Sequence, residues 1–288
     1  RIMTLTERVF PGVDWEEKTP ADLGFDSEKL AAVETWLRQT SQPDEPYHFV
    51  LCRSGYLFAE WLQNVDPQTH QPQASAAKSY YSSMLAIAVA EGKIPSPDAK
   101  VVDYYPAMMD VPPGEGPKEG RHAFDKDREI TFRQLICNCS GYMKPGEEPG
   151  QVFHYQTYGM NILTHALAVL YDLYDVQDPE RLPGCGQLIK DKIRNPIAGT
   201  GTYNYTNFDL HSNARLNIFG HYTQIRSTAR DTARIGWLWL NYGHWNGQQV
   251  VPENYLRAAT QTNDFIKASE PEEKWGYGHV FWVNDYGV

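Results

Sequence analysis

The run Ser75-Ala-Ala-Lys78 is the sequence feature that most restricts what this chain can fold into. It follows a polar, proline-containing loop and leads into residues 79–91, whose apolar content predicts a buried helix. Residues three apart lie on one face of a helix, so the Ser75 hydroxyl and the Lys78 amine are predicted to lie side by side. The unpaired N–H groups at a helix N-terminus favour developing negative charge. A serine, an amine and such a terminus are the parts that acyl transfer needs.

Ser75 and Lys78 also have a second interpretation, as a helix-capping serine followed by a surface lysine. The pattern is short enough to occur by chance. Tyr155 presents a similar choice. It lies between a loop rich in proline and glycine (145–150) and a predicted helix (158–170), where functional side chains are often exposed but where tyrosines also simply pack.

Composition excludes several functional classes. The 288 residues are enough for one large domain or two smaller ones, and the net charge of −10 argues against binding nucleic acid or anionic membranes by bulk electrostatics. No apolar run reaches the roughly 18 residues of a membrane span. The four cysteines are too scattered for a disulfide framework, and the histidines and cysteines lack metal-binding spacing. We therefore expect free thiols and no metal or cofactor; the compartment, cytoplasmic or exported, and the oligomeric state stay open.

Local signals predict the order of the elements. Asp26 is expected to cap a helix to about Arg38, and the turn Arg53-Ser-Gly55 to join two strands as a hairpin. Residues 277–283 are expected to form one strand. The remaining predicted helices begin after Thr131, Thr157, Ser227 or Thr228, and Pro252.

Strands near both ends and helices between them predict an α+β fold, an antiparallel sheet flanked by helices with an inserted, mostly helical domain. We expect residues 1–95 and 205–288 to form the sheet domain and residues 96–204 to form the insertion.

Several further segments occur in a fixed order along the chain. Taken together, the chain resembles the serine β-lactamase and D,D-peptidase superfamily, which includes the penicillin-binding proteins. Within it, the chain is similar to family VIII carboxylesterases, class C β-lactamases and 6-aminohexanoate-oligomer hydrolases. The segments that carry the resemblance, besides 75–79, are Glu91-Gly-Lys-Ile94, Asp103-Tyr-Tyr-Pro106, 130–141 ending in Ser140-Gly141, Phe153-His-Tyr155, 227–236 and 243–252.

The resemblance implies a β-lactamase/transpeptidase-like fold in which Ser75 attacks a carbonyl and forms an acyl-enzyme. Lys78 and Tyr155 would exchange the proton. Free lysine and tyrosine are poor bases at neutral pH, and a close pair titrates as a unit, so neither is singled out. By analogy alone, Thr157, His221 and Tyr222 would contact the substrate.

Two departures from the family pattern guide the expected function. Thr157 stands where the lactamases have an asparagine that holds the substrate amide. This change favours a small ester over a β-lactam as the substrate, and an amide is the second choice. The family's third motif, a strand that supplies an oxyanion-hole N–H, does not occur up to Val288; we expect these C-terminal strands to lie beyond it. The alternatives are β-lactamase or D,D-peptidase activity, and a binding protein that kept the fold without catalysis.

Overall fold

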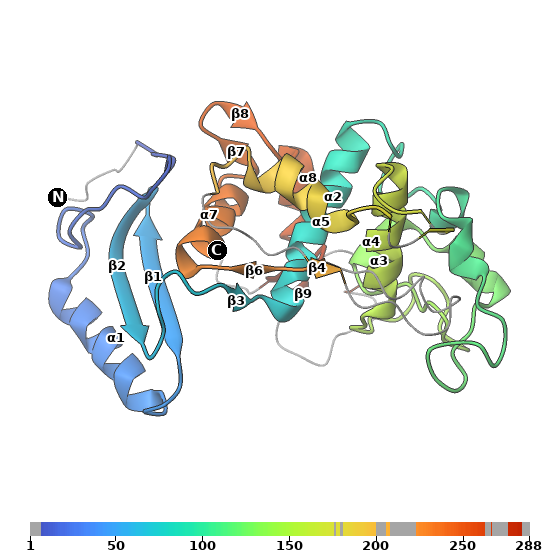
Figure 1. The fold of residues 1–288 in the computed structure, drawn as a ribbon, viewed down its shortest axis with the longest axis horizontal. Coiled ribbons are helices and arrows are strands. Elements are labelled where there is room, and N and C mark those ends of the chain that lie inside the picture. The colour runs from blue at the N-terminus through green and yellow to red at the C-terminus, as the bar shows by residue number, and fades with distance from the viewer. Residues whose placement is uncertain are drawn as a thin grey trace.

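The computed structural model describes residues 7–175, 177–178, 181–199, 206–207, 223–262, 266 and 276–283. Figure 1 shows an elongated molecule with helix α1 (Ser27–Thr40) and the strand pair β1 (Tyr47–Arg53) and β2 (Tyr56–Gln63) at one end. Helices α3 (Phe132–Ile136) and α4 (Tyr158–Leu170) lie toward the other end. Helix α2 (Ala77–Ala90) runs between these two parts of the fold.

The described strands form five two-stranded antiparallel pairs, β1–β2, β3–β6, β4–β5, β7–β8 and β9–β10. This mixture of helices and antiparallel strands is the predicted α+β fold. The other elements are β3 (Gln71–Pro72), α5 (Cys185–Ile189) continuing into a π-helical turn (Lys190–Arg194), β4 (Thr206–Asn207), β5 (Thr223–Gln224), β6 (Arg226–Ser227), α7 (Ala229–Leu240), β7 (His244–Trp245), β8 (Gln248–Gln249), α8 (Glu253–Ala259), β9 (Gly276–Tyr277) and β10 (Trp282–Val283).

The predicted caps and turns are present. The Asp26 carboxylate accepts hydrogen bonds from the N–H groups of Glu28 and Lys29, and Thr131 accepts one from the N–H of Gln134. These side chains satisfy N–H groups that the first helical turn leaves unpaired. The β1–β2 turn places both Ser54 and Gly55 at positive φ, which matches the right-handed twist of a hairpin.

The sequence of α1 places Leu30, Val33, Trp36 and Leu37 at helical spacing, which predicts an apolar stripe, but this stripe is not buried. No residue of α1 is buried, and the side chains of Val33 and Trp36 are exposed. Helix α1 lies at the outer edge of the molecule beside the β1–β2 pair (Figure 1), so its stripe does not reach the main core. The period of the pattern identified the helix correctly, but it did not identify what the helix packs against.

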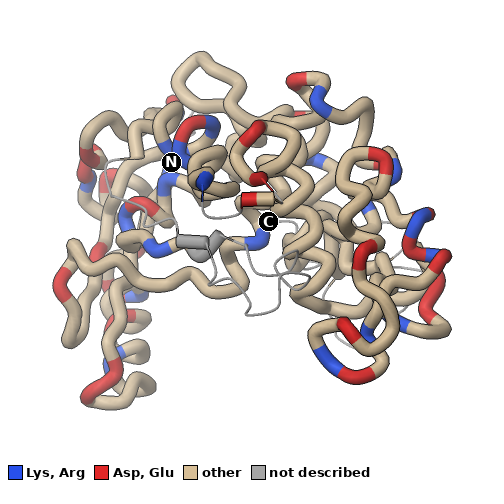
Figure 2. Tube along the Cα trace, turned by 45° about the vertical axis from the view of Figure 1, so that its right-hand side comes forward, with Lys and Arg blue, Asp and Glu red and all other residues tan. Residues whose placement is uncertain are grey.

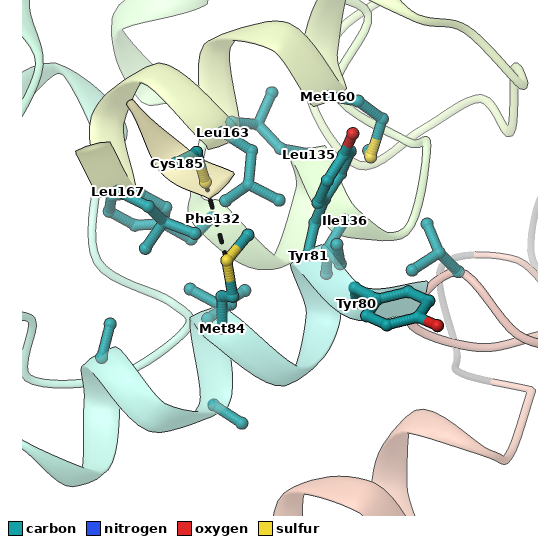
Figure 3. Close-up of a cluster of buried hydrophobic side chains, with 14 of the residues drawn as sticks. Tyr80, Tyr81, Met84, Phe132, Leu135, Ile136, Met160, Leu163, Leu167 and Cys185 are labelled. Atoms are coloured by element: carbon teal, nitrogen blue, oxygen red, sulfur yellow. Dashed lines mark hydrogen bonds between the residues drawn. The ribbon is translucent and has the colours of Figure 1, made fainter. Parts of the chain in front are cut away.

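The core centres on α2. Eleven of its fourteen residues are buried, so this helix is enclosed on nearly all sides rather than amphipathic. Figure 3 shows Tyr81 and Met84 of α2 among side chains from α3, α4 and α5. The thiol of Cys185 lies 3.6 Å from the Met84 sulfur, and all four cysteines are free thiols. This packing fixes the position of α2, and with it Lys78 in its first turn and Ser75 in the turn that precedes it.

The N-terminal segment is bound to α7 by arginines. The guanidinium of Arg234, which is fully buried, donates to the carbonyls of Pro11 and Val13. Arg230 makes a two-point ion pair with Glu60 of β2 at 3.0 and 2.6 Å. The charged part of the segment 227–236 is thus structural, since it joins α7 to the first strands and to the chain that precedes them.

Residues 277–283 do not form the single strand that the sequence predicts. Strands β9 and β10 pair with each other through a tight turn, in which the N–H of Gly278 donates to the carbonyl of Phe281. Val280 in this turn has a φ of 59°, a left-handed conformation that an extended strand excludes. The Ser79 hydroxyl of α2 donates to the carbonyl of Val280 at 2.9 Å and so ties this turn to α2.

Figure 2 shows acidic and basic residues interspersed over the fold. Among the described helices, none has the length and apolar character needed to cross a membrane.

Candidate active site

A short distortion of the backbone presents Ser75. Strand β3 pairs with β6, and the N–H of Gln73 donates to the carbonyl of Ile225 at 2.8 Å. A 3-10 turn over residues 74–76 then leads into α2. Ala74 has a φ of 44°, which costs an L-amino acid roughly 1–2 kcal/mol. Strain of this kind is concentrated at functional sites, where the surrounding structure enforces it.

Ser75 and Lys78 lie together, as their spacing predicts. The Lys78 Nζ donates a hydrogen bond to the Ser75 Oγ at 2.9 Å. Ser75 is exposed, whereas Lys78 is only 7 % exposed. Ser75 does not occupy the N-cap of α2, which is Ala76, so the helix-cap interpretation does not describe its place. The arrangement can stabilise a serine alkoxide beside an ammonium, or pass the serine proton to a neutral amine.

Tyr155 lies against the same lysine. The Lys78 Nζ is 5.3 Å from the centre of the Tyr155 ring, within the range of a cation–π contact. Tyr155 is 39 % exposed and comes from the segment between α3 and α4. The structure therefore brings together the three residues predicted to be catalytic, Ser75, Lys78 and Tyr155.

Aromatic residues from the β9–β10 hairpin surround Tyr155. Trp282 stacks on its ring with a centroid separation of 6.2 Å and an interplanar angle of 25°. The Tyr277 ring meets it edge-on at 6.4 Å. Trp282 is 48 % exposed, so it and Tyr155 form an apolar wall beside Lys78 that solvent reaches. Neither hairpin residue could be assigned to the site from the sequence, because a tryptophan or tyrosine in a strand pattern is usually part of a core.

Tyr277 and His279 of this hairpin stay neutral near physiological pH. Burial, with a smaller effect of Tyr155, raises the pKa of Tyr277 far above its ordinary value. Burial and the neighbouring Arg133 lower the pKa of His279 to about 4. Arg133 contacts the Nε2 of His279 at 3.3 Å and is itself held by a two-point ion pair with Asp98. Tyr277 and His279 therefore do not change their charge near pH 7.

The remaining predicted site residues are placed differently. Thr157 is exposed at the N-terminus of α4, and its hydroxyl makes no capping hydrogen bond. His221 and Tyr222 lie outside the described residues. His154, next to Tyr155, contacts the Lys144 Nζ and lies 3.4 Å from a Glu147 oxygen. Burial lowers the pKa of Lys144.

No group of three or more potential metal ligands is found in the parts of the chain that the structure describes. A groove of about 580 Å³ lies between β1 and α7, and its walls do not include Ser75, Lys78 or Tyr155. The three candidate catalytic side chains therefore lie outside this groove.

Comparison with known proteins gives a consistent result. A family model described as beta-lactamase matches residues 50–288. No curated protein sequence matches the chain. A predicted 6-aminohexanoate-dimer hydrolase from Bacillus anthracis has a similar structure, with a TM-score of 0.64 and 16% identity over 88% of this chain and 68% of that one.

Two further solved structures are similar. A class C beta lactamase from Rhodobacter sphaeroides has a TM-score of 0.57 and 15% identity, covering 90% of this chain and 76% of that one. A penicillin binding protein from Bacillus halodurans has a TM-score of 0.53 and 13% identity, covering 80% and 78%. At these identities the likenesses bear on the fold.

Proposed function

Because the chain belongs to the beta-lactamase family, we propose that it is a serine hydrolase that acts on a small ester through an acyl-enzyme on Ser75. The observation that carries the proposal is the 2.9 Å hydrogen bond from the Lys78 Nζ to the Ser75 Oγ, beside the ring of Tyr155. An exposed serine in contact with a buried amine has the geometry of an activated nucleophile.

In the proposed reaction the Ser75 Oγ attacks the ester carbonyl carbon while its proton passes to the Lys78–Tyr155 pair. The carbonyl oxygen becomes an oxyanion, which N–H groups near the start of α2 can stabilise. Collapse of this intermediate breaks the bond to the leaving alkoxide, and the pair returns the proton to it. Water then attacks the acyl-enzyme and gives up a proton to the same pair. The bond between the acyl carbon and the Ser75 Oγ breaks, the pair passes the proton to the Oγ, and the carboxylic acid is released.

The pair rather than a single base carries the proton. The Lys78 Nζ lies over the face of the Tyr155 ring, so the charge of each residue affects the other. We therefore assign proton transfer to Lys78 and Tyr155 jointly.

An ester is favoured over a β-lactam because Thr157 offers one short hydroxyl where the lactamases hold the substrate amide with an asparagine. An amide is the second candidate, because the protein of similar structure from Bacillus anthracis is named a putative 6-aminohexanoate-dimer hydrolase. Nitrocefin hydrolysis distinguishes the third candidate, a β-lactamase.

The direct test is hydrolysis of p-nitrophenyl butyrate by the full-length protein and its variants. Ser75→Ala should lower kcat/KM by at least about 1,000-fold, as loss of a nucleophile does in other serine hydrolases. Lys78→Met should lower it by a similar order while filling the same buried space. Ser96→Ala and Lys93→Met, which change the same residue types away from the site, should keep normal activity.

Each variant should be shown to be folded by near-ultraviolet circular dichroism. Undiminished hydrolysis by folded Ser75→Ala would exclude Ser75 as the nucleophile. Turnover of nitrocefin at a rate above that of the ester would replace the ester by a β-lactam as the substrate class.

A further inference from the structure

We propose that Asn138 is a positioning residue for Tyr155. It binds the backbone of the residues immediately before and after Tyr155, and it also binds the hydroxyl of Tyr277, whose ring packs against the Tyr155 ring. The inference rests on the proposed function, in which Tyr155 takes part in proton transfer. Asn138 follows helix α3 and precedes Tyr155 by a long loop; it lies in the segment 130–141 that carries the family resemblance, but no sequence signal gives it a role in the site.

The first contacts of Asn138 are with the backbone around Tyr155. Its side-chain Oδ1 accepts a hydrogen bond from the N–H of Gln156 at 3.1 Å. Its own backbone carbonyl accepts one from the N–H of His154 at 2.8 Å. A single residue therefore binds the residues immediately before and after Tyr155, which fixes the point from which the tyrosine side chain leaves the backbone.

The second contact reaches the ring beside Tyr155. The Asn138 Nδ2 donates to the hydroxyl of Tyr277 at 2.9 Å. A backbone N–H can only donate, so the bond from Gln156 places the amide oxygen on that side and the amide nitrogen toward Tyr277. The Tyr277 ring in turn meets Tyr155 edge-on.

Asparagine suits this place for two reasons. Asn138 is buried, so each polar atom of its amide needs a partner, and both ends of the amide have one. Its φ is 57°, a left-handed conformation that asparagine and aspartate adopt more readily than other residues with side chains. Aspartate would keep this backbone preference and an acceptor for the N–H of Gln156, whereas alanine would keep neither.

The effect expected of Asn138 is on catalysis rather than on substrate binding. Misplacing a reacting group by about 1 Å can cost on the order of 100-fold in rate. We therefore expect Asn138→Ala to lower kcat for p-nitrophenyl butyrate by about 10- to 100-fold per active site, with KM changed less than about threefold. Asn138→Asp should recover most of the lost kcat.

The experiment is a double-mutant cycle with Tyr155→Phe, with rates normalised to the fraction of Ser75 that a fluorophosphonate labels at completion. If Asn138 acts through Tyr155, adding Asn138→Ala to Tyr155→Phe should lower kcat by less than about twofold. Independent effects, in which the two losses multiply, would overturn the inference.

Two further variants keep the test decisive. Tyr277→Phe removes one arm of the contact and leaves the backbone of Asn138 unchanged; it should lower kcat by about three- to tenfold and also be non-additive with Tyr155→Phe. This variant decides the matter if Asn138→Ala does not fold. Asn241→Ala removes another buried asparagine, which bonds the carbonyl of Trp237 away from the site, and should leave kcat per labelled site unchanged.

The outcomes separate this inference from the proposed function. If Tyr155→Phe lowers kcat strongly while Asn138→Ala and Tyr277→Phe do not, the positioning role is wrong and the role of Tyr155 stands. If Tyr155→Phe has no effect, both fail together, since there is then no catalytic group for Asn138 to position.

Discussion

Replacing Gly278 by alanine should lower the free energy of unfolding, whereas replacing Gly236 by alanine should raise it. In the β9–β10 hairpin, a Cβ on Gly278 would lie 1.9 Å from the carbonyl oxygen of Ala259 and 2.9 Å from that of Gln261. On helix α7, a Cβ on Gly236 would meet no atom within 4 Å. The same chemical change therefore creates a clash at one site and only removes backbone freedom at the other.

The magnitudes follow from these contacts. Gly278→Ala must move the hairpin by about 1 Å, an overpacking that typically costs 1–3 kcal/mol. The shift also strains the bond from the N–H of His279 to the carbonyl of Ala259, worth about 1 kcal/mol. We expect a total loss of about 2–4 kcal/mol. Gly236→Ala should stabilise the protein by about 1 kcal/mol, the difference in helix propensity.

The measurement is urea unfolding of both variants, with thermal unfolding as a second readout at about 2 °C per kcal/mol for a chain of this size. Gly278→Ala should also lower esterase activity, because Tyr277 and Trp282 move with the hairpin. Substitutions that disturb no contact usually change the free energy of unfolding by less than about 0.5 kcal/mol. A change this small for Gly278→Ala would refute the reasoning.

Two further predictions concern the same hairpin. His279 has an ordinary pKa of 6.5 and a folded-state pKa of about 4, so the unfolded chain binds a proton first as the pH falls. The stabilisation that depends on neutral His279 is complete above pH 6.5, and about 2–3 kcal/mol of it is lost as the pH falls from 6.5 to 4. In His279→Gln, the free energies of unfolding in urea at pH 7 and 4.5 should differ less than they do in the wild type. An equal difference would contradict this assignment. Ser79→Ala should cost about 1 kcal/mol by removing the bond to the Val280 carbonyl, and a neutral effect in the same assay would show that the hairpin does not depend on it.

Much of the fold could be predicted because its signals are local. Asp26 and Thr131 cap helices through their own side chains, and Gly92 ends α2 at a φ of 70°. The family prediction is confirmed by the family model, which matches residues 50–288. The spacing of three residues, which places two side chains on one face of a helix, likewise predicted the contact between Ser75 and Lys78. The division into 1–95 with 205–288 and 96–204 stays a prediction.

The features that the sequence did not reveal depend on contacts between distant segments. Residues 277–283 have a strand-like composition, but they form a hairpin that contacts α2 through the bond from Ser79 and approaches Ala259 closely at Gly278. The role inferred for Asn138 depends on Tyr277, which is far away in sequence. Neither a periodic pattern nor a motif spacing contains such pairings, because each segment alone would adopt several structures.

The central claim is that Ser75, in contact with Lys78, is the nucleophile. Mapping the adduct of a fluorophosphonate on the full-length protein by peptide mass spectrometry tests it most directly. The account predicts one adduct, on the peptide that contains Ser75, formed more slowly in Lys78→Met and absent in Ser75→Ala. An adduct on another residue, or none on the folded wild-type protein, would contradict it.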